Sequence, residues 1–64
     1  MMQLFDIIYT VPYEGECTIH DCLVEEVLAW IQSSPPDYTE YARIVPTGQI
    51  WYDSWNFVHT FGKA

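Results

Sequence analysis

The stretch LFDIIYTV, at residues 4–11, decides the fold because it is typical of a strand inside a sheet. Phe5, Ile7 and Tyr9 fall on one face of an extended chain, and the other face is apolar except at Asp6 and Thr10. Such β-branched and aromatic residues favour strands, and two apolar faces favour a central position. The strand is expected to end at proline 12, with a loop over residues 13–16.

A helix is expected next, over residues 19–32. Thr18, as the N-cap, and Asp21, three residues later, have the spacing of a capping box. Apolar residues then recur at helical spacing, namely Ile19, Leu23, Val24, Val27, Leu28, Trp30 and Ile31. The segment SSPP at residues 33–36 should end the helix, because a residue that precedes proline disfavours the helical conformation.

The remaining residues are predicted to complete a sheet. Residues 41–45 are expected to form a strand, residues 45–48 a turn, and residues 49–52 a returning strand. Residues 55–61 alternate apolar and polar positions and are expected to form a last, edge strand. The sequence therefore predicts one α+β domain over residues 1–64. Its architecture is one helix packed on a three- to four-stranded, mostly antiparallel sheet, in the order β-α-β-β with or without a fourth strand.

The charge is the clearest functional signal in the sequence. Nine acidic residues against two basic ones give a formal net charge of −7. Phosphates and anionic lipid surfaces attract lysine and arginine, so direct binding to nucleic acid or to a membrane is not expected. Basic proteins are the expected partners, above all those that bind nucleic acid. The alternative explanation is that negative charge only keeps the protein in solution.

Two groups of residues are candidates for partner binding. Five carboxylates lie within thirteen residues: Glu14, Glu16, Asp21, Glu25 and Glu26. On the predicted helix, Glu25 and Glu26 would lie beyond the reach of the N-terminal dipole, and spacings of about 5–6 Å would imitate phosphates. The second group is aromatic and consists of Trp51, Tyr52 and Trp55, because a small sheet has too few inward positions for all its aromatic residues.

The cysteine and histidine residues raise the question of a metal or a nucleophile. Cys17, His20, Cys22 and His59 are zinc-ligand types. On the predicted helix, however, Cys17 and Cys22 would occupy hydrophobic-staple positions and pack together. We therefore expect no metal and no cofactor, with zinc or a disulfide as alternatives. No oxyanion-hole motif or glycine-rich phosphate loop accompanies Cys22, so no catalytic residue is assigned and no enzymatic activity is expected.

These observations favour a small acidic, non-catalytic inhibitor or binding protein that occludes a basic, nucleic-acid-handling site on a partner protein. In size, charge and fold class alone, the chain resembles acidic proteins of phages and mobile elements, such as anti-CRISPR and anti-restriction proteins. One alternative is an oligomerising, for example homodimeric, or adaptor domain that uses an aromatic sheet face. A second is a minor metal-binding protein. The first residues lack the basic start of a signal peptide, which favours the cytoplasm of the host cell.

Overall fold

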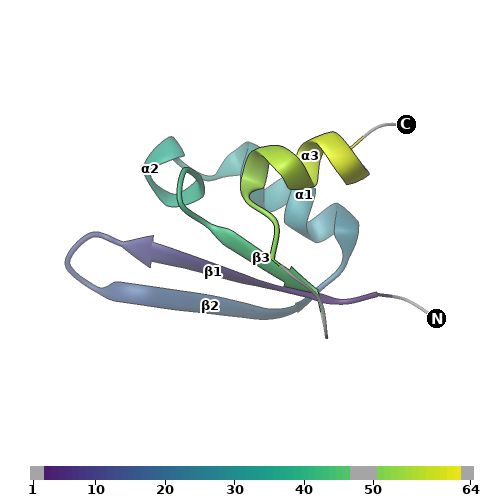
Figure 1. Ribbon diagram of the computed structural model, residues 1–64. Helices are drawn as coiled ribbons and strands as arrows, with labels where there is room; N and C mark the ends of the chain where they lie inside the picture. The colour runs from purple at the N-terminus through teal and green to yellow at the C-terminus, as the bar shows by residue number, and fades with distance from the viewer. Residues whose placement is uncertain (1–2, 47–50, 63–64) are drawn as a thin grey trace.

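The computed structural model describes residues 3–46 and 51–62. Three strands form an antiparallel sheet in the order β2-β1-β3; they are β1 (Phe5–Val11), β2 (Gly15–Cys22) and β3 (Arg43–Pro46). The helices of the described residues lie on one side of this sheet (Figure 1); they are α1 (Val24–Ser33), α2 (Pro36–Thr39) and α3 (Ser54–Phe61). The α+β class and the central place of residues 5–11 are confirmed. The element order is β-β-α-α-β-α and not β-α-β-β.

A tight hairpin joins β1 to β2. The Glu14 N–H donates a hydrogen bond to the Val11 carbonyl at 3.1 Å, and Tyr13 has a φ of 71°. Proline at the second position and a positive φ at the third are typical of a type II turn. The hairpin reaches beyond the helices at the left of Figure 1. Its pairing carries residues 15–22 into the sheet, so the predicted helix start and the capping box at Thr18 are wrong.

Helix α1 begins five residues later than the sequence predicts. Its N-cap is Leu23, whose N–H donates to the Glu26 carboxylate at 2.8 Å. The acidic residue three positions after the N-cap is therefore Glu26, whereas the sequence predicts Asp21 in this role. The predicted apolar stripe is confirmed over α1, because Val27 is fully buried and Leu28, Trp30 and Ile31 pack against the core.

Strand β3 overlaps the predicted strand at residues 41–45. Its Ile44 exchanges two backbone hydrogen bonds of 2.8 Å with Tyr52, which confirms that the chain returns beside β3 at that point. The predicted turn at residues 45–48 begins in the last two residues of β3, and its second half and the first part of the returning strand fall on residues 47–50, outside the described residues. The bridge at Tyr52 covers the outer edge of β3. In residues 3–46 and 51–62, the outer edge of β2 pairs with no strand.

Residues 55–61 form helix α3, so the prediction of a last strand is wrong. The Asp53 carboxylate accepts a hydrogen bond from the Asn56 N–H at 2.7 Å and thereby caps the helix. Phe57 is fully buried, and Phe61, one turn further on, also faces the core. Trp55 is exposed on the other side.

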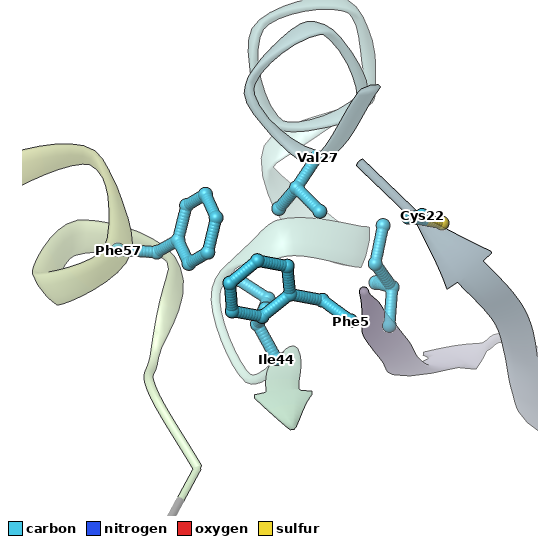
Figure 2. Close-up of a cluster of buried hydrophobic side chains, with 6 residues drawn as sticks. Phe5, Cys22, Val27, Ile44 and Phe57 are labelled. Atoms are coloured by element: carbon cyan, nitrogen blue, oxygen red, sulfur yellow. The ribbon is translucent and has the colours of Figure 1, made fainter. Parts of the chain in front are cut away.

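The core lies between the helices and one face of the sheet. Figure 2 shows side chains from five elements converging there; the buried cluster consists of Phe5, Ile7, Cys22, Val27, Ile44 and Phe57. The rings of Phe5 and Phe57 meet edge to face, with centroids 5.1 Å apart. Such aromatic pairs stabilise a fold beyond the area that they bury. The C-terminal helix is therefore joined to the central strand through aromatic contacts.

The opposite face of the sheet is not covered by any helix of the described residues (Figure 1). Alternation along β1 places Asp6, Ile8 and Thr10 on this open face. Polar contacts cross it at two points. The Arg43 guanidinium pairs with the Glu16 carboxylate, and His20 Nδ1 lies 3.3 Å from Asp6 Oδ2.

Candidate binding surfaces

The five predicted acidic residues do not gather on one helix face. Glu14 and Glu16 lie at the hairpin, whereas Asp21, Glu25 and Glu26 lie at the far end of β2 and the start of α1. The positions of Glu16 and Asp21 along the paired strand β1 are four residues apart, so at about 3.4 Å a residue they are separated by about 14 Å. The expectation of closely spaced carboxylates along a helix is therefore wrong. The acids mark the two ends of the outer strand instead.

Two of the five acids have structural roles. Glu16 is paired with Arg43, and Glu26 accepts the N–H of Leu23 at the start of α1. Glu25 and Glu26 both lie in the first turn of α1, where the helix dipole favours negative charge. The expectation that they lie beyond this dipole is wrong. Their presence needs no functional explanation by itself.

A β-bulge fixes the position of Asp21. Between the pairs Phe5–Cys22 and Ile7–Ile19, β1 has one residue and β2 has two, His20 and Asp21. Asp21 has a φ of 57°, and its N–H donates to Asp6 Oδ1 at 3.2 Å. Aspartate tolerates this left-handed conformation better than most residues do. The bulge leaves the Asp21 side chain exposed.

The three predicted aromatic residues separate into two exposed side chains and one packed side chain. Trp51 is 55% exposed and Trp55 is 71% exposed. Tyr52 packs against Phe57 and Phe61, with ring centroids 6.0 and 5.5 Å away. Trp55 lies on α3 and Trp51 precedes it in the chain, so the exposed tryptophans do not form a sheet face. The predicted aromatic sheet face is therefore wrong in its location.

A hollow of about 500 Å³ lies beside Trp55; its lining residues are Ile31, Thr39, Glu40, Asp53, Ser54, Trp55 and Val58. We call it the Trp55 hollow. A second hollow, of about 450 Å³, shares Ile31 and Val58 with it and continues toward Leu28 and Gly62. Together they follow the line where α3 meets α1. The sequence reasoning missed this site because it placed residues 55–61 in a strand.

Contacts beside the Trp55 hollow hold its walls in place. Ser54 Oγ donates to the Thr39 carbonyl at 2.7 Å and so ties the start of α3 to the end of α2. The Asp53 carboxylate is held on both oxygens by Asn56, at 2.7 Å to the backbone N–H and 3.1 Å to the side-chain amide. The signal that sequence reasoning overlooked was Asp53 itself, because aspartate is a favoured N-cap residue.

The predicted metal-ligand types are dispersed. Cys17 faces the helix side of β2, since it pairs with Tyr9, whereas His20 contacts Asp6 on the open face. His59 lies on α3 and stacks on Trp55 with ring centroids 5.1 Å apart. In the described part of the chain, no group of three or more histidine, cysteine, aspartate or glutamate residues is placed to hold a metal ion.

The predicted staple of Cys17 and Cys22 is wrong. Both residues lie in β2, and their partners on β1 are four residues apart, so they are separated by about 14 Å along the sheet. Both are free thiols, and this separation excludes the alternative of a disulfide between them. Cys22 is a buried core residue, and burial, followed by the nearby carboxylates of Glu26, Asp6 and Asp21, raises the pKa of its thiol. A raised pKa disfavours the thiolate that nucleophilic catalysis requires.

Comparison with protein-family models, with curated proteins and with solved structures finds no match to this chain. Across residues 3–46 and 51–62, no helix is both long and apolar enough to cross a membrane.

Proposed function

We propose that this protein is a small acidic binding module, without catalytic activity, that occludes a basic, nucleic-acid-handling site on a partner protein. One observation carries the proposal. Arg43 is the single lysine or arginine among the described residues, and it is already paired with Glu16. Exposed Glu14, Asp21 and Glu25 are therefore opposed by no free basic side chain in that part of the protein.

The arrangement of these acids suits contact over an extended basic surface. They lie at both ends of β2, so a partner with basic residues about 14 Å apart would meet carboxylates at each end. Complementary potentials of this kind accelerate encounter and select the partner more than they tighten the complex. The mechanism is steric and electrostatic occlusion, as in the phage and mobile-element inhibitors that the chain resembles in size, charge and fold class.

The residues that line the two hollows support a protein without catalytic activity. Neither the Trp55 hollow nor its neighbour is lined by a cysteine or a histidine. The Ser54 hydroxyl at the first hollow donates to the Thr39 carbonyl, and among the described residues it forms no hydrogen bond to a carboxylate or a histidine. A nucleophile needs such a base or a lowered pKa to react.

The test is competition with nucleic acid. The immobilised protein is used to capture a basic partner from lysate, and the anisotropy of a labelled oligonucleotide on that partner is then followed. We expect the protein to displace the oligonucleotide, with an effect that weakens as salt rises. The variant Glu14→Gln, Asp21→Asn, Glu25→Gln should associate more slowly, and asparagine suits the left-handed position 21.

Asp37→Asn serves as the matched control, because it removes one exposed carboxylate from α2. For each carboxylate removed, the association rate should fall less in this control than in the triple variant. Simultaneous binding of oligonucleotide and protein to the partner would contradict occlusion. Equal capture by the triple variant and the wild type would contradict the role of the acids along β2.

A second candidate function is an adaptor or homodimerising domain. The observation that favours it is the exposure of Trp51 and Trp55, since tryptophan is enriched in the energetic centres of protein interfaces. Sedimentation velocity of the wild type and of Trp55→Ala, over a wide range of concentration, distinguishes the two functions. A dimer that Trp55→Ala dissociates would favour the second candidate.

A further inference from the structure

The Trp55 hollow combines three kinds of chemistry in one place. Its walls carry an exposed indole, two carboxylates from Glu40 and Asp53, and the apolar side chains of Ile31 and Val58. An apolar hollow without charges binds apolar groups, and a pair of carboxylates without an apolar wall binds cations of any shape. The combination of a flat aromatic surface, acids and an apolar floor is suited to a cation that has an aliphatic stem.

The indole of Trp55 is available for such a contact. His59 stacks parallel to it, with an interplanar angle of 5°, and the histidine does not line the hollow. Trp55 nevertheless remains 71% exposed. The stack therefore holds the ring in one orientation while leaving much of it open to a ligand. Tryptophan is the aromatic side chain that attracts cations most strongly.

The two carboxylates differ in how they are held. Asp53 is fixed by its two hydrogen bonds to Asn56. Glu40 is exposed, and among the described residues its carboxylate forms no ion pair. Since a carboxylate accepts up to about four hydrogen bonds, both groups retain capacity for a donor from outside.

From these features we infer that the Trp55 hollow binds an arginine side chain of a basic partner. The planar guanidinium stacks on the indole and donates to the carboxylate of Glu40, while its aliphatic stem lies against Ile31 and Val58. Arginine fits better than lysine because its charge is planar and weakly hydrated. The inference rests on the proposed function in one respect, that the partner is basic. It adds the contact between an arginine of that partner and the Trp55 hollow.

The test uses Nα-acetylarginine N-methylamide as the probe. Its citrulline counterpart is the control, because citrulline has nearly the same shape and no charge. Each is titrated into 15N-labelled protein, and the shifts of the tryptophan indole N–H signals are followed. We expect a saturating shift of the Trp55 signal with the arginine probe, and little shift of Trp30 or Trp51. Equal shifts with both probes would overturn the inference.

Two variants locate the site, and a third is their matched control. Trp55→Leu and Glu40→Gln should each weaken binding of the arginine probe about two- to fivefold. Asp37→Asn removes the same charge from α2, outside the lining of the hollow, and should leave probe affinity unchanged. All three positions are exposed, so the spectra of the variants should retain the fold. Equal losses in Glu40→Gln and Asp37→Asn would show attraction by net charge alone and would overturn the site.

The inference and the proposed function can fail separately. If the arginine probe leaves Trp55 unmoved while a basic partner still displaces oligonucleotide in the occlusion assay, the inference fails and the function stands. If the probe binds at Trp55 but the captured partner holds protein and oligonucleotide together, the function fails and the arginine site stands.

Discussion

The two faces of the sheet differ in what they contribute. On the helix-covered face, Phe5, Ile7 and Ile44 are at most 1% exposed and contact the apolar side chains of α1 and α3. On the open face, strands β1, β2 and β3 present Asp6, Glu16 and Arg43 in exposed polar contacts. Burial of apolar area dominates the free energy of folding, whereas exposed ion pairs contribute little. Stability therefore lies on one face, which leaves the other free to vary in charge.

The substitution Phe57→Ala tests this difference with the largest expected effect on stability. The side chain is fully buried and contacts Phe5 and Tyr52, so its loss should cost about 3–5 kcal/mol of unfolding free energy. At about 0.05–0.15 kcal/mol per residue, a domain of 64 residues has a total stability of about 3–10 kcal/mol, so this loss should remove a large part of it. Urea denaturation followed by circular dichroism measures it. Trp55→Ala, on the exposed side of the same helix, is the control, and an equal loss there would contradict the assigned helix face.

Asp53→Ala should have the next largest effect. It removes the side-chain cap of α3 and should cost about 1 kcal/mol. Asp53→Asn should be nearly neutral, since asparagine caps helices equally well. Thermal melts of the two variants test the prediction. A neutral Asp53→Ala variant would mean that the cap does not hold α3 onto the covered face.

The open face should respond much less. Glu16→Gln removes the ion pair with Arg43 and should cost about 0.2–1 kcal/mol at low salt, because both side chains are exposed. The difference from wild type should shrink as salt rises. Chemical denaturation at two salt concentrations measures this effect, with Glu14→Gln as the control in the adjoining turn. A loss as large as that of Phe57→Ala would remove the distinction between the faces.

The smallest effect concerns the Cys22 thiol on the covered face. Its pKa is raised above the ordinary value of 9.0, first by burial and then by Glu26, Asp6 and Asp21. The neutral thiol is therefore favoured in the folded protein, so this contribution to stability is complete below pH 9.0 and is lost as the pH rises through the folded pKa. Iodoacetamide at pH 8.5 should modify Cys17 before Cys22. Mass spectrometry measures the order, and faster modification of Cys22 would contradict its burial.

Sequence reasoning identified the elements whose patterns are strong and whose partners are nearby. The central strand and the apolar stripe from Val24 to Ile31 were predicted because period and composition agree there. Residues 15–22 were misassigned because a capping-box spacing at Thr18 is a local signal, and pairing with β1 overrides it. Residues 55–61 fit both periods, and only the cap at Asp53 favours the helix.

The candidate surfaces could be predicted only in part, for the same reason. The net charge and the high content of aromatic residues follow from the composition, whereas the Trp55 hollow depends on how α2 and α3 meet. The Ser54–Thr39 contact that joins them spans fifteen residues. Glu40 had no visible role in the sequence, because its neighbours in the hollow come from distant segments. Long-range packing of this kind leaves no local pattern.

The unequal edges of the sheet have a consequence for self-assembly. A fibril grows by strand addition only if each subunit can pair with a neighbour at both edges of its sheet. Here Tyr52 bridges Ile44 on the outer edge of β3, whereas the outer edge of β2 pairs with no strand in residues 3–46 and 51–62. Joining two copies through β2 would use the open edge of both, and the joined sheet would end there. Strand addition through β2 alone therefore ends at two copies and does not extend into an endless sheet.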